Sequence, residues 1–261
     1  MTILSQITDL VNSQALPLKI DTIRATFYKN TITHKTKTKL SVLNKIAKKH
    51  GKRWQKLDKE SKKALKISNR HEFKNLEIIN IYALSDSSIF YATTKADNND
   101  KQKAMIEFYG LSQYDKEPPP KGLINELLQA VNNITSVDLC FDSQTPFNIN
   151  AIKELYSVTE YGNYAKTYYI NQAELQTLQR CYFYDKGKKD ILGTPLYRVE
   201  ATANIYDYST SNNFLITQKE RLTLQLNESI KELSHIISLA TTYPVANKPY
   251  KAKHNKRELR A

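Results

Sequence analysis

The stretch that decides the fold runs from Tyr164 to Ile205 and reads YAKTYYINQAELQTLQRCYFYDKGKKDILGTPLYRVEATANI. Three runs in it, residues 165–171, 180–186 and 196–204, alternate with a period of two. Because successive side chains of a strand point to opposite faces, each run predicts a strand with one packed face and one presented face. The third run sets an apolar stripe behind a polar row, which is typical of a sheet whose open face carries chemistry. This polar row consists of Arg198, Glu200, Thr202 and Asn204.

The rest of the chain predicts more strands and a few helices. We expect helices over residues 2–12, 40–47, 54–67, 123–131, 150–158 and 216–238, with Thr2 and Asn150 as N-caps. We expect further strands over residues 18–28, 75–84, 88–94, 104–110 and 136–142. Many strands with few long helices between them indicate an α+β fold, with a central, mostly antiparallel β-sheet, helices packed on one face and a basic helical N-terminal insertion.

The net charge of +13 is concentrated at the two ends of the chain. Residues 1–75 hold 18 Lys and Arg against 5 Asp and Glu, and residues 246–261 hold 6 against 1, whereas residues 76–245 hold 15 against 20. Clustered positive charge favours a polyanionic partner, because each neutralised phosphate releases counterions. The plain alternative is a solvated basic face. We therefore predict a basic N-terminal region, a central domain and a basic mobile tail with these boundaries, the first strand belonging to the core.

Composition excludes several classes of protein. Cys140 and Cys181 lie inside predicted strands without metal-ligand spacing, so we expect buried thiols rather than a disulfide or a zinc site. The apolar runs are too short to cross a bilayer and the N-terminus lacks the features of a signal peptide, so we expect a soluble, cytoplasmic protein with no membrane contact. Six glycines and no glycine-rich phosphate loop argue against a nucleotide hydrolase or a Rossmann enzyme.

Three acids are candidates for metal binding. Asp138 and Asp142 share one face of their predicted strand, and Glu200 stands on the polar side of the last strand. Carboxylates without histidines suit a hard divalent ion, Mg²⁺ or Mn²⁺, better than zinc. The alternative is structural: Asp138 forms an ordinary salt bridge with Arg198 or Lys186, and Asp142 caps a turn.

Strand parity selects one of the 17 tyrosines as a candidate nucleophile. Tyr169 points away from Tyr168 and Ile170 and is surrounded by polar and basic residues. A phenolate that attacks a phosphate needs its ring held beside the group that absorbs the developing charge. Trp54, the only tryptophan, lies in the basic block, where it can stack on a base or, as we favour, anchor the insertion to the body.

The order of four motifs carries a resemblance to a known family. These motifs are Ser136-Val137-Asp138-Leu139-Cys140-Phe141-Asp142, Thr167-Tyr168-Tyr169-Ile170, Tyr184-Asp185-Lys186 and Arg198-Val199-Glu200. Over about residues 76–235 the chain resembles the replication initiation factor family of rolling-circle plasmids, filamentous phages and conjugative elements, which nick and close DNA through a tyrosine. The resemblance implies that Tyr169 takes the 5′-phosphate covalently, that Asp138 and Glu200 hold Mg²⁺ or Mn²⁺ with Asp142 nearby, and that Lys186 steadies the phosphate.

The resemblance also implies the partners of the protein. DNA at a replication origin, both double- and single-stranded, is the expected partner, and a host helicase and DNA polymerase are expected to act with it. Exposed Tyr182 or Tyr184 would stack bases of the melted strand. The residues expected to contact nucleic acid are Lys48, Lys49, Lys52, Arg53, Lys56, Arg180, Tyr182, Lys188, Lys189 and Arg198.

Two alternatives remain open at this point. Ser136, Asn171 and Tyr182 stand where the family pattern has arginine, glycine and arginine, which favours a non-catalytic DNA- or RNA-binding protein. A mobilisation relaxase that acts at a transfer origin would share the nicking chemistry and differ only in its DNA context.

Overall fold

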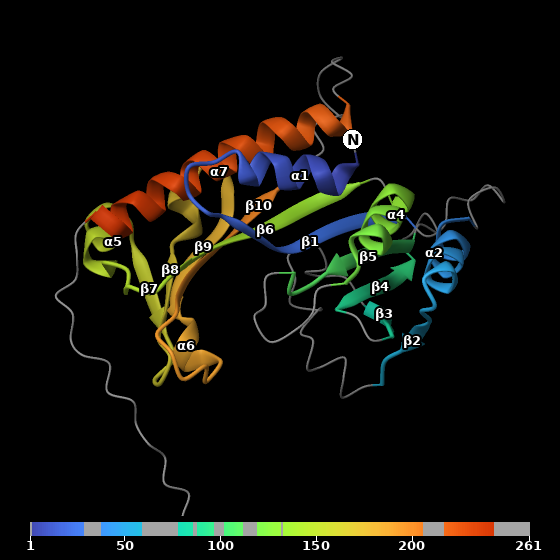
Figure 1. Ribbon diagram of the computed structural model, residues 1–261, viewed down its shortest axis with the longest axis horizontal. Helices are drawn as coiled ribbons and strands as arrows, with labels where there is room; N and C mark the ends of the chain where they lie inside the picture. Colours follow the sequence, from blue (N-terminus) through green and yellow to red (C-terminus); the bar gives the residue numbers. More distant parts are fainter. Residues whose placement is uncertain are drawn as a thin grey trace, which may run out of the picture. The chain divides into compact units, whose positions relative to one another are not determined.

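The computed structural model describes residues 2–28, 38–58, 78–85, 88–96, 102–111, 119–131, 133–205 and 217–242 (Figure 1). Its helices are α1 (Ile3–Asn12), α2 (Thr38–Lys49), α4 (Lys121–Val131), α5 (Ile149–Leu155), the short α6 (Lys186–Lys189), α7 (Gln218–Thr242) and the 3₁₀ turn η4 (Gln172–Glu174). Its strands are β1 (Lys19–Tyr28), β2 (Trp54–Lys56), β3 (Ile78–Leu84), β4 (Ile89–Ala96), β5 (Gln102–Phe108), β6 (Ile134–Ser143), β7 (Val158–Tyr161), β8 (Thr167–Ile170), β9 (Leu178–Asp185) and β10 (Tyr197–Asn204).

The predicted α+β class is confirmed. The strands hydrogen-bond in the order β2-β3-β4-β5-β1-β6-β10-β9-β8-β7, and the paired registers of the outer strands are antiparallel. Contacts divide the chain into two compact units, which are described separately below. Unit 1 comprises Met1–Leu139 with Thr202–Ile230, and unit 2 comprises Cys140–Ala201 with Lys231–Ala261.

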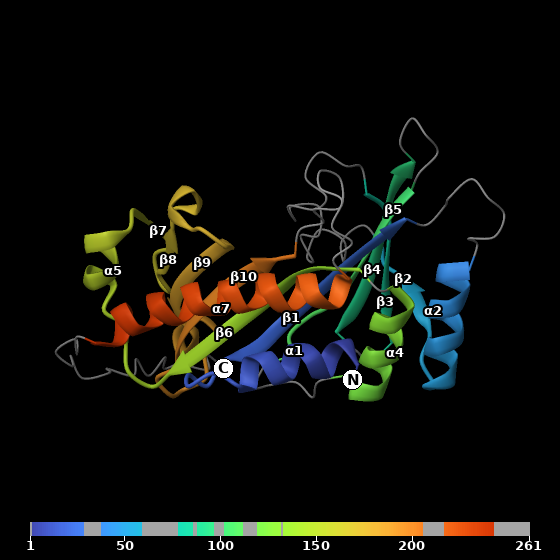
Figure 2. The ribbon, with the colours of Figure 1, turned by 90° about the horizontal axis from the view of Figure 1, so that it is seen from above.

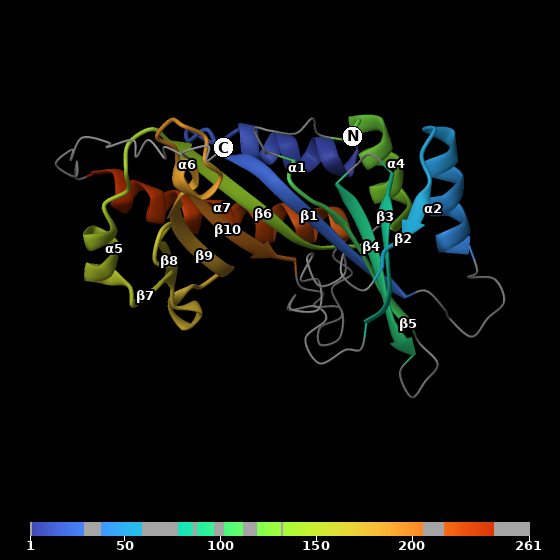
Figure 3. The ribbon, with the colours of Figure 1, turned by 90° about the horizontal axis from the view of Figure 1, so that it is seen from below.

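Unit 1 is a sheet with helices along one face. Thr2 caps α1 as predicted, because its side chain accepts a hydrogen bond from the backbone of Ser5. Gln6 of α1 donates to Thr223 of α7 at 2.6 Å, which joins the two helices. Figure 2 shows α1 and the first half of α7 side by side above the strands, and Figure 3 shows β1 and β5 from the opposite side. The apolar core of the unit includes Ile23, Ile106 and Leu127, which are fully enclosed.

Unit 2 packs β7, β8 and β9 between helices on one face and a row of tyrosines on the other. Phe147, just before α5, contacts Phe183 of β9 with ring centroids 5.2 Å apart. Glu232 of α7 accepts hydrogen bonds from three successive backbone amides, residues 176–178, and so fixes the turn that leads into β9. Burial alone would raise the pKa of Glu232, but these donors and the Thr177 hydroxyl outweigh it and hold the pKa below its ordinary value.

Some element predictions need correction. Residues 54–56 form the strand β2, since Trp54 pairs with Leu84, and the rest of the predicted helix falls mainly outside the described residues. The N-cap of α5 is Asn148 rather than Asn150, and the chain then forms β7 instead of continuing the helix. The predicted basic mobile tail, residues 246–261, also lies outside the described residues. Both cysteines are buried free thiols, as predicted.

Candidate functional site

Four rings form a continuous tyrosine row across β7, β8 and β9 in unit 2. The row consists of Tyr161, Tyr169, Tyr182 and Tyr184. Tyr169 faces Tyr182 across the β8–β9 pair, with ring centroids 4.9 Å apart and nearly parallel planes. Tyr182 stacks in turn on Tyr184 at 5.8 Å, and Tyr161 meets Tyr169 edge-on at 5.4 Å. Because these residues alternate along their strands, all four rings lie on one face of the sheet.

Glu200 of β10 is the carboxylate at the inner end of the tyrosine row. The Tyr184 hydroxyl donates to Glu200 Oε1 at 2.5 Å, and the Tyr182 hydroxyl donates to Oε2. Burial, followed by the negative charge of Glu200, raises the pKa of Tyr184 far above its ordinary value. Tyr184 therefore acts as a fixed hydrogen-bond donor and is a poor source of phenolate.

Arg198 anchors the acidic end of this network. It is 1% exposed and donates two bonds to Asp142, Nε to Oδ1 at 2.6 Å and Nη2 to Oδ2 at 2.9 Å. Its Nη1 lies 3.6 Å from Glu200 Oε1. Burial alone would lower the pKa of Arg198, but the hydrogen bonds and charge of Asp142 raise it above the ordinary value. Arg198 is a buried structural cation, so its predicted contact with nucleic acid is wrong.

Asp138 belongs to a second buried network, in unit 1. Arg24 of β1 donates Nη1 and Nη2 to the two oxygens of Asp138, at 2.9 and 2.7 Å. The same guanidinium donates Nε to Glu107 at 2.9 Å, and the Thr202 hydroxyl donates to Asp138 at 2.7 Å. The salt-bridge alternative for Asp138 is correct in kind, but the partner is Arg24 rather than Arg198 or Lys186.

The three acids predicted to bind a metal, Asp138, Asp142 and Glu200, already accept hydrogen bonds from protein groups. Both oxygens of Asp138 and of Asp142 accept bonds from a guanidinium, and both oxygens of Glu200 accept bonds from tyrosine hydroxyls. Within the described ranges, no group of three or more His, Cys, Asp or Glu side chains gathers as a metal-ligand set. In this fold, the three carboxylates do not form the ligand set of a Mg²⁺ or Mn²⁺ centre.

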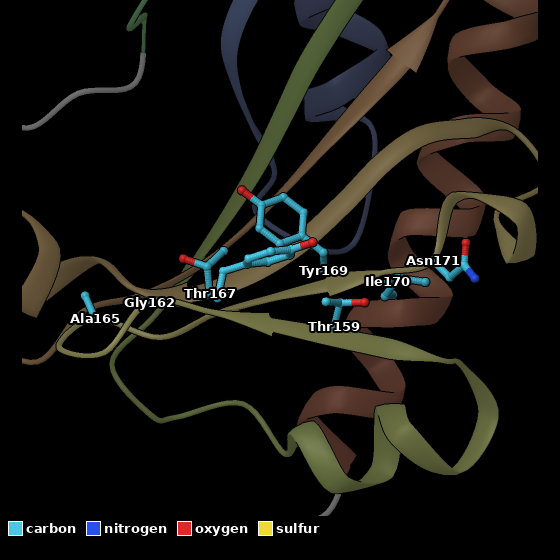
Figure 4. Close-up of a pocket in the computed structure, with 8 residues that line it drawn as sticks. Thr159, Gly162, Ala165, Thr167, Tyr169, Ile170 and Asn171 are labelled. Atoms are coloured by element: carbon cyan, nitrogen blue, oxygen red, sulfur yellow. The ribbon is translucent and has the colours of Figure 1, made fainter. Parts of the chain in front are cut away.

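Tyr169 is the member of the row that combines a fixed ring with access to solvent. It is half-buried and lines a pocket, whereas Tyr182 and Tyr184 are 9% and 5% exposed. Among the residues that the structure describes, none hydrogen-bonds to its hydroxyl. The predicted parity is confirmed: Tyr168 pairs across the strands with Phe183 and faces the opposite side, where Lys153 of α5 lies 5.8 Å from its ring. Figure 4 shows Tyr169 beside Thr167 and Thr159 at the pocket.

The Tyr-Asp-Lys motif has a structural role in this fold. Asp185 caps α6 by accepting a bond from the backbone of Lys188 at 2.8 Å. Lys186 is buried, and its Nζ donates to Asp190 at 2.5 Å. A Cβ on Gly187 would collide with the carbonyl of Thr194, so this glycine allows a close approach of the following loop. The ammonium of Lys186 is thus committed to Asp190 in this conformation.

The other cations predicted to contact nucleic acid lie on both units. In unit 2, the guanidinium of Arg180 lies 5.2 Å from the Tyr182 ring centroid, and Lys189 lies 4.3 Å from that of Tyr184. The Nζ of Lys188 is 3.0 Å from Asp185. In unit 1, the exposed members of the predicted set are Lys48, Lys49, Arg53 and Lys56, and Lys52 is half-buried.

Two residues of the basic block, Lys49 and Trp54, are tied into unit 1 by neighbouring contacts. Lys49 pairs with Glu126 of α4 at 2.8 Å, and the hydrogen bond that Lys49 donates lowers the pKa of Glu126. Trp54 meets Tyr91 edge-on at 4.8 Å and donates to the carbonyl of Leu43. The favoured interpretation of Trp54 as an anchor is confirmed by these contacts.

Two corrections concern the predicted stacking surface. Tyr182 and Tyr184 are buried between neighbouring rings, so neither is the exposed platform that the sequence suggested. Among the described residues of unit 2, the exposed rings are Tyr161 and Tyr164, at 59% and 73%. Sequence analysis missed Tyr161, although the alternation of residues 158–161 before Gly162-Asn163 is a hairpin signal. It also missed Arg24, whose only signal is a lone cation within an apolar strand.

Comparison of the chain with family models, with curated proteins and with solved structures finds no match.

Proposed function

We propose that the protein is a rolling-circle replication initiator that binds DNA and nicks one strand, with Tyr169 as the nucleophile. The observation that carries the proposal is the setting of Tyr169. Its ring is held by stacking on Tyr182, its side chain lines an open pocket, and the stacked partner is hydrogen-bonded to Glu200. A nucleophile needs this combination of a fixed ring and an accessible oxygen.

The chemistry is a transfer of one phosphodiester. The phenolic oxygen of Tyr169 bonds to phosphorus, its proton passes to solvent or a neighbouring base, and the bond from phosphorus to the 3′ oxygen breaks. The 3′ oxygen leaves as a hydroxyl after taking up a proton, which gives a free 3′-OH for a polymerase and a 5′-phosphotyrosine link. Attack by that 3′-OH on the link reverses the step and closes the strand.

The surrounding charges support DNA as the substrate. The exposed Lys48, Arg53 and Lys56 of unit 1 suit contacts with duplex phosphates, and Arg180 and Lys189 lie along the tyrosine row. A dependence on Mg²⁺ or Mn²⁺ remains a prediction of the family resemblance.

The experiment uses the full chain and a supercoiled plasmid. The plasmid carries the DNA that flanks the coding sequence of this protein. With Mn²⁺ or Mg²⁺, wild-type protein should give open circles and a DNA adduct that survives detergent. Tyr169→Phe keeps the stacked ring but removes the oxygen, so it should give neither product. Tyr168→Phe is the matched control, because it changes the neighbouring phenol on the other face and should still nick. EDTA should abolish nicking. Nicking by Tyr169→Phe would rule out the proposed nucleophile.

One observation favours a second candidate, a single-strand-binding protein that does not cut. All three acids already accept hydrogen bonds from protein groups, as expected of structural carboxylates. This candidate predicts salt-sensitive DNA binding that survives EDTA and no adduct with any metal. A relaxase is distinguished from the initiator by which flanking sequence, a replication or a transfer origin, is cut.

A further inference from the structure

The hairpin of β7 and β8 encloses a pocket that the proposed nicking step does not by itself require. Its volume is about 700 Å³, large enough for a nucleotide, and it opens to solvent (Figure 4). Rings, hydroxyls and one amide line it, and no charged side chain is among the lining groups. The lining residues include Thr159, Tyr161, Thr167, Tyr169 and Asn171.

Two aromatic walls of different stiffness bound this pocket. Tyr169 is supported from behind by the buried Tyr182, so its ring is fixed. Tyr161 meets it at 83° and is 59% exposed, so its ring can turn without breaking any packed core. An exposed tyrosine beside a fixed one offers the apolar faces that a flat aromatic ligand needs for stacking.

Polar groups at the rim of the pocket suit the edge of a heteroaromatic ring. Asn171 Oδ1 accepts a hydrogen bond from the backbone of Ala173, which orients the amide and directs its NH₂ group away from that turn. The hydroxyls of Thr159 and Thr167 can donate or accept. Carbonyl oxygens and ring nitrogens of nucleobases are matching partners. In a duplex these stacked faces are inaccessible, so the ligand must be unpaired.

We propose that the pocket binds one unpaired nucleobase of single-stranded DNA, stacked on the exposed ring of Tyr161 and in contact with Tyr169. The assignment to DNA rests on the proposed function, and it places the bound nucleotide next to the phosphate that Tyr169 attacks. Arg180, whose guanidinium lies over the ring of Tyr182, is positioned on the same face to contact the adjoining phosphates. The stacking contact selects single strands without fixing the base sequence.

The experiment measures fluorescence anisotropy of two labelled probes on the full chain. One probe is a short oligothymidine, and the other is an abasic oligomer with the same length and charge. Wild type should bind the oligothymidine more tightly. Tyr161→Ala should weaken binding of the oligothymidine about tenfold, the effect of losing one base–aromatic stack, and leave the abasic probe unchanged. Tyr161→Phe should bind like wild type, because stacking needs the ring and not the hydroxyl.

Tyr164→Ala is the matched control, since Tyr164 is a more exposed tyrosine of the same hairpin but does not line the pocket. It should stay within about twofold of wild type for both probes, well below the loss of a stack. Equal loss on both probes by Tyr161→Ala, or no loss on either, would overturn the pocket assignment. Base-dependent binding without any adduct would keep the pocket and reject nicking. If the wild-type protein nicks DNA but Tyr161→Ala binds both probes as wild type does, nicking is kept and the pocket assignment is rejected.

Discussion

The two aspartates of β6, Asp138 and Asp142, are each paired with a buried arginine, but the two pairs have different neighbours. Arg24 grips Asp138 in unit 1 and Arg198 grips Asp142 in unit 2, each through two hydrogen bonds to the two carboxylate oxygens. The guanidinium of Arg24 also pairs with Glu107, which is buried too. The second guanidinium lies near Glu200, which accepts a hydrogen bond from Tyr182. Tyr182 stacks on Tyr169, and Tyr169 lines the pocket.

This difference distinguishes a carboxylate within a buried network from one whose network extends to a solvent-accessible residue. A buried ion pair is weak evidence for stability, because the cost of removing both charges from water offsets their attraction. Such a pair is informative when one of its members leads to an accessible group. The Asp142 pair does so through Glu200 and the tyrosines, whereas the contacts described above for the Asp138 pair run to the buried Glu107 and Thr202. This is why we propose the chemistry in unit 2.

Removal of Arg24 should have the largest effect on stability. Arg24→Met leaves Asp138 and Glu107 buried without their cation, which should lower the free energy of unfolding by about 3–5 kcal/mol. Urea denaturation followed by circular dichroism measures this loss. Lys49→Met removes an exposed pair with Glu126 in the same unit and serves as the control, with a much smaller change expected. Equal losses in the two variants would mean that the buried network is not what stabilises this part of the sheet.

Removal of Arg198 should cost less stability but should also change binding. Arg198→Met unpairs Asp142 and shifts Glu200, so we expect a loss of about 2–4 kcal/mol in urea denaturation. Because Glu200 holds the hydroxyls of Tyr182 and Tyr184, the support behind Tyr169 should loosen, and affinity for the oligothymidine should fall. Arg24→Met, compared at a temperature where both variants are folded, should keep that affinity. Parallel loss of binding in both variants would erase the distinction between the two pairs.

A periodic sequence pattern predicts some features of these two pairs and not others. Alternation assigned Tyr169 and Glu200 to the correct faces of their strands, because side-chain parity is a local property. The partner of Asp138 was out of reach, since Arg24 lies 114 positions away and no pattern gives the order of strands in a sheet. The burial of Tyr182 was equally hidden, because parity gives the face of a strand and not what covers it.

Glu232 is a carboxylate that accepts hydrogen bonds from neutral donors instead of from an arginine. Glu232→Gln should cost about 2 kcal/mol at neutral pH, because an amide NH₂ then faces backbone donors. The folded-state pKa of Glu232 is lowered, so its contribution is complete above the unfolded value of about 4.3 and is lost as the pH falls through the folded value. The difference in unfolding free energy between wild type and variant should therefore shrink in acid. A difference that stays constant down to low pH would show that the charge of Glu232 is not what holds the turn.

The smallest expected effect concerns the hairpin that carries the outer wall of the pocket. Gly162 has a φ of +85°, and an added Cβ would lie 2.9 Å from the carbonyl of Ala165. Gly162→Ala should cost about 1 kcal/mol in thermal or urea unfolding and should also weaken binding of the oligothymidine by displacing Tyr161. Gly193→Ala is the control, since φ is +73° there and the space around it is open. It should show a similar loss of stability with unchanged binding, because a strained backbone away from the pocket leaves both tyrosine walls in place.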